Sequence, residues 1–496
     1  MNIFTAYSGH MKRIVFLFVL LTPFFAFAQS TKPAENPGYE IKVTFKPFQN
    51  QWIYLGYYGG SAKTLPIIDS VVVNGRSEGI FKGTKKLGGG VYLVGYPNKL
   101  GFFEFLVGKD QHFSIIADSS DLQNIKFVNS PDNDLFVSYR RFMSEHGGKI
   151  DSAKQLISGL NEQGKKDIDN FITKKNKDIR DYRLNIIKKY PETTLAFLLR
   201  LLEEPEIPPA DKHPGGKYDS AFAYRYYKSH FWEGINFYDD RLARTPIFDS
   251  KLDKYFDQVV VPHPDSVIKE MDYMLGFASA SDELQKFLLL KFVNRYLNQK
   301  YMWEDAVFVH LYEKYFSQKT YPWITEKGVK MIQDRAYSLM ANILGNPAAD
   351  IDLPDSTGKH VPLYSIASPY TVVVIWDPTC GHCKEVVPKV DSMLEAKWKA
   401  QGVKVYGMAK ETDGTKKDWL DFIHDHHLVD WVNVYYSKAD DKARIDAGIP
   451  GYSQLYDVLS FPTLYLLDKD KRIIAKKLSY DQINEVLQQK ISTATK

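Results

Sequence analysis

The chain has 496 residues, of which 44% are hydrophobic, and its formal net charge is +4 at pH 7. This length allows two to four domains with substantial apolar cores. The charge is small for the length, and no basic stripe with interleaved aromatic residues occurs, so we expect no nucleic-acid partner. The 32 Tyr and 30 Phe indicate a folded protein and argue against a disordered one.

The N-terminus has the features of an export signal. A basic pair, Lys12-Arg13, precedes the apolar run Ile14–Phe25, and Ala26-Phe27-Ala28 fits a cleavage site before Gln29. The apolar run is shorter than the roughly 20 residues that span a bilayer, although a transmembrane anchor is the alternative. Residues 1–28 are therefore predicted to be a signal peptide, cleaved near Ala28/Gln29. We expect a periplasmic protein with no stable membrane span after cleavage.

Residues 39–129 are predicted to form a small antiparallel β domain, either a sandwich or an open barrel. Short alternating runs such as Glu40–Phe45 and Val91–Tyr96 are separated by Gly, Asn and Pro. Asn74-Gly75 follows the run Asp69–Val73 and predicts a β-hairpin there. No catalytic cluster occurs in this region.

Residues 130–346 are predicted to form an α-helical middle domain, because apolar residues recur there at spacings of three and four. Leu284–Leu297 and Ala306–Phe316 show this pattern. The aromatic cluster at 222–238 fits either an interhelical core or a groove for unfolded protein, and the core is the favoured interpretation.

Residues 348–496 alternate between strand and helix patterns, which predicts a mixed sheet flanked by helices. The apolar run Tyr370–Trp376 is typical of a fully buried strand. Further strands are predicted at Val403–Ala409, Trp431–Tyr436 and Leu464–Leu467. The fold class is therefore multidomain, with a β domain, a helical domain and a C-terminal α/β domain.

The only two cysteines of the chain, Cys380 and Cys383, form a Cys-x-x-Cys motif directly after the strand Tyr370–Trp376. A helical pattern follows them, and this strand–helix context is typical of a thiol–disulfide redox site. A thiol at a helix N-terminus is exposed to unpaired N–H groups and to the positive end of the dipole, which favours the thiolate.

A local structural disulfide and a zinc half-site are the alternatives for this motif. The disulfide would close a loop too small to stabilise much, and structural zinc needs four ligands in a chain without further cysteines. The redox interpretation is therefore preferred, and no metal is expected. His424-Asp425-His426-His427 could suggest a metal site, but a solvated helix face is the favoured interpretation.

With these residues, the C-terminal region resembles the thioredoxin-like domain of exported thiol–disulfide oxidoreductases of the TlpA/ResA type. The motifs that carry the resemblance are Trp376, Cys380-Gly381-His382-Cys383-Lys384, Pro388 and Phe461-Pro462-Thr463. The order of a β domain, a helical domain and this domain also resembles a family of exported bacterial thioredoxin-like proteins.

The resemblance implies a role for each residue of the site. Cys380 is expected to be the attacking nucleophile and Cys383 the resolving thiol. Pro462 is expected to be a cis-proline, and the backbone of Phe461 is expected to pair with an extended substrate segment. The residues expected to tune the cysteine pair are His382, Lys384 and Trp376.

The same Cys-Gly-His-Cys sequence occurs in protein disulfide isomerase. By that analogy the site is expected to be more oxidising than thioredoxin, whose potential is about −270 mV. The resemblance implies no cofactor. The expected partners are cysteine-containing envelope proteins and a redox partner that recharges the cysteine pair. The alternative function is an envelope binding or scaffold protein whose thioredoxin-like domain is a redox-gated adaptor.

The sequence departs from these relatives at several positions. Val374 stands where thioredoxins have a buried Asp, and Val386 stands where ResA-type proteins have a Glu. The proton acceptor for Cys383 is therefore open, with Asp377 or a water as alternatives. Phe461 replaces a smaller residue before the expected cis-proline. A peroxiredoxin is excluded because Thr379 adjoins Cys380 and does not lie three residues before it.

Overall fold

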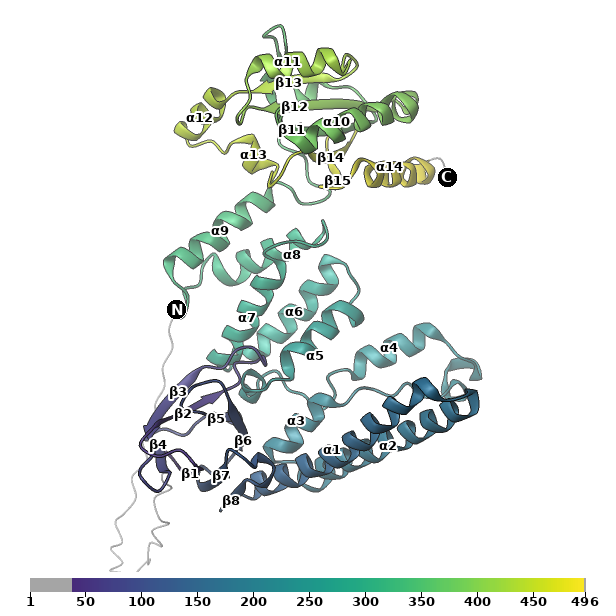
Figure 1. Ribbon diagram of the computed structural model, residues 1–496. Coiled ribbons are helices and arrows are strands. Elements are labelled where there is room, and N and C mark those ends of the chain that lie inside the picture. Colours follow the sequence, from purple (N-terminus) through teal and green to yellow (C-terminus); the bar gives the residue numbers. More distant parts are fainter. Residues whose placement is uncertain (1–37, 495–496) are drawn as a thin grey trace, which may run out of the picture.

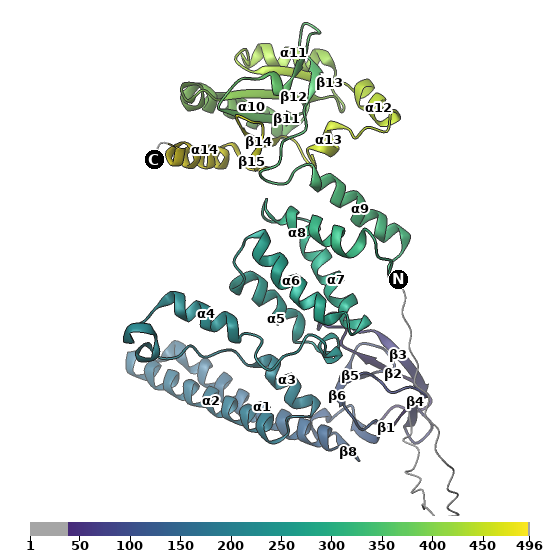
Figure 2. The ribbon, with the colours of Figure 1, turned by 180° about the vertical axis from the view of Figure 1, so that it is seen from behind.

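The computed structural model describes residues 38–494, so the predicted signal peptide of residues 1–28 lies outside the described residues. The β domain lies at one end of an elongated molecule, the C-terminal α/β domain lies at the other, and helices fill the space between them (Figure 1). Figure 2 shows the same succession from behind. The three predicted fold classes are confirmed. In the described part of the chain, no helix combines the length and the apolar character that crossing a bilayer requires.

The β domain is a sandwich of two four-stranded sheets, with strand orders β4-β1-β7-β8 and β3-β2-β5-β6. The inner faces share a core that contains Phe45, Phe81 and Phe105. The neighbours are antiparallel except for β1 and β7, which are parallel. The strands are β1 (Tyr39–Lys46), β2 (Trp52–Tyr57), β3 (Ile67–Val72), β4 (Glu78–Gly83), β5 (Gly90–Gly95), β6 (Phe102–Val107), β7 (His112–Asp118) and β8 (Lys126–Val128).

The predicted hairpin at Asn74-Gly75 is wrong. The chain does turn there, since the Ser77 N–H donates to the Asn74 carbonyl oxygen over 2.9 Å. However, β3 pairs with β2 and β4 pairs with β1, so the two strands belong to different sheets. Val73 is fully buried in the sandwich core at this crossing. Because Val73 is buried between the sheets, the chain crosses from one sheet to the other at this turn, and β3 and β4 do not pair as a hairpin.

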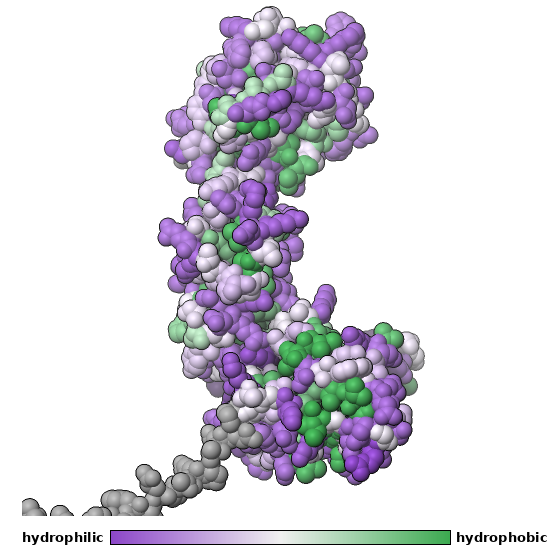
Figure 3. All heavy atoms as spheres, turned by 90° about the vertical axis from the view of Figure 1, so that its left-hand side faces the viewer, coloured by the Kyte–Doolittle hydropathy of each residue, from purple (hydrophilic) through white to green (hydrophobic). Residues whose placement is uncertain are grey.

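Apolar side chains gather on the outer surface of the β domain, which forms the lower right of the view in Figure 3. The exposed apolar residues on β3 and β4 are Ile67, Ile68, Val72 and Ile80. Because β3 is the edge strand of its sheet, these side chains lie beside unpaired backbone groups.

The helical domain begins with a long hairpin of α1 and α2, which lie side by side in Figures 1 and 2. Its core also includes Tyr58, Val91, Leu93 and Leu106 from the β domain, so these two domains share one continuous apolar cluster. The helices are α1 (Pro131–Leu156), α2 (Glu162–Lys189), α3 (Thr194–Leu202), α4 (Ser220–His230), α5 (Phe248–Lys254), α6 (Pro264–Ala278), α7 (Asp282–Tyr296), α8 (Glu304–Leu311) and α9 (Glu326–Met340).

The aromatic cluster at 222–238 contributes mainly to the helical core. Phe231 and Phe237 are buried in it, whereas Tyr224 and Tyr238 are exposed. The favoured interpretation, interhelical packing, therefore describes the buried part of this segment.

The C-terminal domain is built on a five-stranded mixed sheet with the order β13-β12-β11-β14-β15. β11, β12 and β13 are parallel, and β14 and β15 are antiparallel to their neighbours. The strands are β11 (Tyr370–Trp376), β12 (Lys404–Lys410), β13 (Val432–Tyr436), β14 (Thr463–Asp468) and β15 (Ile473–Lys476). A short hairpin of β9 (Asp352–Pro354) and β10 (His360–Pro362) precedes them.

Helices cover both faces of this sheet, so its central strand is buried on both sides. This explains why the run Tyr370–Trp376 is almost continuously apolar. The helices are α10 (Gly381–Met393), α11 (Lys416–Asp425), α12 (Lys438–Asp446), α13 (Tyr452–Leu455) and α14 (Tyr480–Ala494). One face packs around Trp376 and Trp398, and the other around Tyr406 and Tyr465.

Candidate active site

Cys380 lies where β11 passes into α10, as the N-cap residue of that helix. A turn held by Asp377 places it there. The Asp377 carboxylate accepts hydrogen bonds from the Thr379 amide and hydroxyl, both at 2.7 Å, and its carbonyl oxygen accepts from the Cys380 N–H at 3.2 Å. The Cys380 side chain is partly exposed. A sulfur in this position is accessible to a partner and lies at the positive end of the helix dipole.

Cys383 lies within the first turn of α10 and is fully buried, in the same apolar cluster as Val374 and Trp376. Both cysteines are free thiols in this structure. Burial is the largest cause that raises the pKa of the Cys383 thiol well above its usual value, and the hydrogen bond with Cys380 and the charge of Asp377 add to it. The two cysteines therefore differ in access and in solvation.

The loop that contains Phe461 and Pro462 faces the cysteine pair, although 81 residues separate Phe461 from Cys380. The Cys380 thiol donates to the Phe461 carbonyl oxygen over 3.9 Å. The Phe461–Pro462 peptide bond is cis, as the resemblance implies. Pro462 also lines a groove of about 560 Å³ together with His382 and Val386. The structure thus brings the predicted substrate-binding residues next to the predicted nucleophile.

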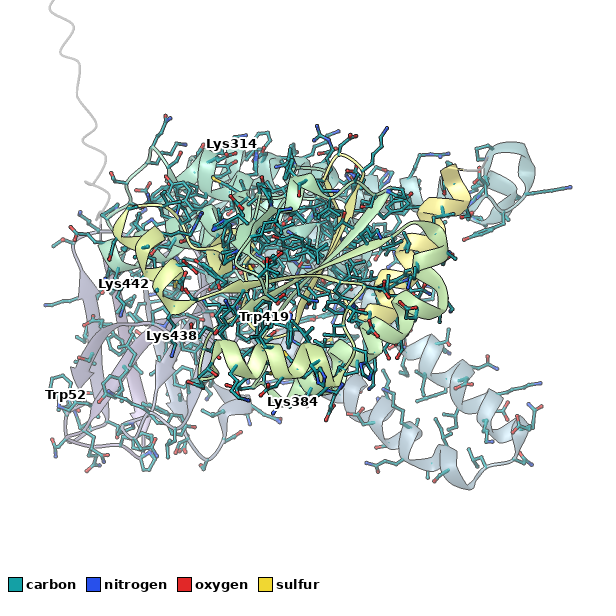
Figure 4. The ribbon with its side chains drawn as sticks, turned by 90° about the horizontal axis from the view of Figure 1, so that it is seen from above. Trp52, Lys314, Lys384, Trp419, Lys438 and Lys442 are labelled. Atoms are coloured by element: carbon teal, nitrogen blue, oxygen red, sulfur yellow. The ribbon has the colours of Figure 1, made fainter. Side chains whose placement is uncertain are left out.

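The three predicted tuning residues occupy different surroundings. His382 is exposed and lines the groove. Trp376 is fully buried, and its ring packs against Phe422 with centroids 4.8 Å apart. Lys384 is exposed and lies at the outer edge of the C-terminal domain, whereas Trp419 lies inside it (Figure 4). Within residues 38–494, no hydrogen bond joins the Lys384 side chain to either cysteine. The geometry therefore favours a role in the groove for His382 more than for Lys384.

The acids that relatives place near the resolving thiol are absent here. Val374 is fully buried beside Cys383, and Val386 packs against the same cluster. Asp377 is only 3% exposed, and its charge acts on Cys383. The two alternatives for the proton acceptor are Asp377 and a water. The turn that positions Cys380 also places Asp377 close to the site, and this favours Asp377.

The histidine-rich run at the end of α11 makes ordinary contacts. His424 lies 3.1 Å from the carboxylate of Asp425, and both side chains are largely exposed. His426 packs on Phe422 with ring centroids 4.2 Å apart. The described residues contain no group of three His, Cys, Asp or Glu side chains arranged to hold a metal ion. These contacts fit a solvated helix face.

Two features near the site were not predicted from the sequence. Met302, in the loop between α7 and α8, packs against the cluster that contains Cys383. Arg335 of α9 forms an ion pair with Asp457, which is 2% exposed and lies five residues before Pro462. The sequence contains little indication of this ion pair, since Asp457 is a single acid among mostly apolar residues.

Comparison with known proteins gives a family match for two parts of the chain. Residues 163–337 match DUF5106, a domain of unknown function. Residues 344–476 match the AhpC/TSA family. None of the curated proteins compared with the chain matches it.

Several solved structures are similar to the chain. A thioredoxin-like protein from Bacteroides caccae is 19% identical, with 58% of this chain and 97% of that chain covered and a TM-score of 0.42. A domain of a possible thiol–disulfide isomerase from Cytophaga hutchinsonii is 33% identical, with 31% and 97% covered and a TM-score of 0.26. The thioredoxin domain of a thiol–disulfide oxidoreductase from Bacteroides vulgatus is 26% identical, with 29% and 96% covered and a TM-score of 0.25.

Proposed function

Since the C-terminal part of this chain belongs to the thioredoxin-like oxidoreductases, we propose that the protein exchanges disulfides with cysteine-containing proteins of the bacterial envelope. The observation that carries this proposal is the pairing of an accessible Cys380 with a buried Cys383 on one helix turn, opposite Phe461 and Pro462. Export depends on residues 1–28, which lie outside the described residues.

In the proposed reaction the Cys380 thiolate attacks one sulfur of a client disulfide. That disulfide breaks, the second client sulfur leaves as a thiolate, and Cys380 is joined to the client in a mixed disulfide. Cys383 then loses its proton and attacks the Cys380 sulfur, which releases the first client sulfur and leaves a Cys380–Cys383 disulfide. Two electrons pass from the cysteine pair to the client, so the client is reduced and the pair is oxidised. A redox partner then reduces the pair again.

The burial of Cys383 orders these steps. Because its pKa is raised by burial, Cys383 stays a thiol in the resting protein and does not compete for the client. We assign the uptake of its proton to Asp377, whose carboxylate is held beside the pair by Thr379. Reduction and isomerisation start with the same attack and differ in whether Cys383 completes the release.

The first prediction concerns the cysteines. We expect a Cys380→Ser variant to lose reduction of insulin disulfides, because the attacking sulfur is gone. A Cys383→Ala variant should accumulate mixed disulfides, because the second attack cannot occur, and these are measured on non-reducing gels. Lys442→Ala, an exposed change on α12, is the matched control and should keep full activity. Turnover retained in Cys380→Ser would contradict the proposed function.

A second candidate is a binding role in the envelope, with the C-terminal domain as a redox-gated adaptor. The apolar surface on the edge strand β3, at Ile67, Ile68 and Val72, is the observation that favours it. Partner binding by the full chain that differs between the oxidised and reduced states, and is lost in Ile68→Lys while disulfide reduction is retained, would favour this second function.

A further inference from the structure

The groove at the redox site continues beyond the C-terminal domain. A second hollow of about 210 Å³ lies where the loop 298–302 and helix α9 of the helical domain face β15. The two hollows share Leu459, Lys477 and Leu478 as lining residues. The two hollows therefore adjoin each other, and we refer to them together as the groove, which extends from Pro462 to the helical domain.

The side chain of one arginine, Arg335, contacts both walls of this groove. The Arg335 guanidinium contacts the Asp457 carboxylate, and it donates to the Gln299 side-chain oxygen at 2.6 Å and to the Leu297 carbonyl oxygen at 3.1 Å. Ser338 also donates to Asp457, at 2.9 Å. The loop of the helical domain and the segment before Pro462 thus depend on the same side chain for their positions.

Buried polar contacts hold the two domains beneath the groove. Lys476 of β15 forms an ion pair with Asp305 of α8, and both are at most 3% exposed. The Asn342 amide donates to the Leu455 carbonyl oxygen at 2.6 Å. Because these groups are removed from water, separating the domains would leave charges and polar atoms unpaired. The groove is therefore a fixed feature of the assembled chain.

The chemistry of the groove suits an extended chain with acidic residues. Leu459 is 73% exposed and Tyr301 is 60% exposed, so each wall presents a large apolar side chain. Five cationic side chains and two carboxylates line the groove, and Asp305 and Asp457 are already paired. Lys300 and Lys389 form no ion pair within residues 38–494. An excess of positive charge therefore faces any bound segment.

We propose that the helical and C-terminal domains together bind an extended, acidic segment of the client polypeptide next to its reacting cysteine. Leu459 and Tyr301 contact the apolar parts of the segment, and Lys300 and Lys389 pair with its carboxylates. This inference rests on the proposed function and adds the class of client. It also gives the helical domain a part in recognition, since Lys300 and Tyr301 belong to that domain.

The test compares two peptides of equal length, each with one cysteine joined to glutathione and flanked by either Glu or Lys. With the full-length protein, we expect the KM for the Glu peptide to be about three- to tenfold lower at low salt, and kcat to be similar. The preference should decrease as salt rises. Lys300→Glu should remove or reverse the KM ratio. Lys300 is exposed, so the change should not affect folding.

Lys327→Glu is the matched control, because Lys327 is exposed on α9 about 12 Å along the helix from Arg335 and should leave the KM ratio unchanged. Hydroxyethyl disulfide reports on the redox reaction itself. If the wild-type protein reduces hydroxyethyl disulfide and has equal KM values for the two peptides, this result overturns the acidic-segment proposal alone. A KM ratio that persists in Lys300→Glu would also overturn it. A wild-type protein that reduces none of the three would overturn the proposed function as well.

Discussion

At the scale of single residues, Cys380 and Cys383 belong to one motif but lie in different surroundings. Cys380 caps α10 and is partly exposed, whereas Cys383 lies inside the apolar cluster of the sheet. Burial disfavours the charged form of Cys383 and raises its pKa, whereas Cys380 lies partly exposed at the N-terminus of the helix. Access and solvation thus distinguish the proposed nucleophile from the proposed resolving thiol.

This difference predicts selective alkylation. In the reduced native protein at pH 7, iodoacetamide should modify Cys380 and leave Cys383 unmodified, because Cys383 is inaccessible and protonated. Peptide mass spectrometry measures both sites, and both should react once the protein is unfolded. Native Cys383 that is alkylated as fast as Cys380 would contradict the proposed roles.

Much of the site at this scale could be predicted from the sequence. The Cys-x-x-Cys motif after an apolar strand predicted the position of Cys380 at the start of a helix, because strand and helix patterns are local. Phe461 and Pro462 were predicted to face the pair only through the resemblance, since 81 residues separate Phe461 from Cys380. The position of Asp377 in a turn with Thr379 required the structure.

At the scale of elements, the segment between α13 and β14 is fixed by the helical domain. Asp457 lies in this segment and is held by Arg335 and Ser338 of α9 and by Lys477, which follows β15. Burial alone would raise the pKa of Asp457, but its hydrogen bonds and ion pairs with Lys477 and Arg335 keep that pKa below its usual value. Helix α9 thus supports the loop that carries Pro462.

The lowered pKa of Asp457 predicts a pH dependence of stability. Its ionised form contributes fully above the ordinary value of 3.8, and the contribution is lost as pH falls below 3.8 toward the folded-state value. Asp457→Asn should therefore lower the free energy of unfolding by about 2 kcal/mol at pH 7 and by progressively less as pH falls below 3.8. Urea unfolding at several pH values measures this.

Asp110→Asn is the control for that series, because Asp110 is exposed and should change stability little at any pH. A constant difference between the wild type and Asp457→Asn over the whole pH range would show that the charge of Asp457 does not contribute.

At the scale of the whole molecule, the three domains are connected in two different ways. The β and helical domains share one apolar cluster, in which Val91 and Leu93 of β5 pack with the helices. The helical and C-terminal domains are joined largely by polar groups, among them the buried pair Lys476–Asp305. An apolar junction tolerates small shifts, whereas a buried ion pair requires both partners to be in place.

The buried pair predicts a double-mutant result. Asp305→Ala should lower the stability of the C-terminal domain by about 3 to 5 kcal/mol, because Lys476 is left buried without a partner. Asp305→Ala combined with Lys476→Met should recover a large part of this loss, since neither charge remains. The urea midpoint of the C-terminal transition measures both effects. A double variant that is no more stable than Asp305→Ala would contradict coupling across the junction.

The sequence by itself determined the nature of each domain and the place of the redox pair, because periodicity, turn residues and motif spacing are local properties of the chain. Only the tertiary structure decided that β3 and β4 belong to different sheets, that Arg335 pairs with Asp457, and that Asp305 pairs with Lys476. The last two pairs join residues 122 and 171 positions apart. Contacts over such separations leave no periodic trace in the sequence, and burial of charges between domains appears only when the cores have been packed together.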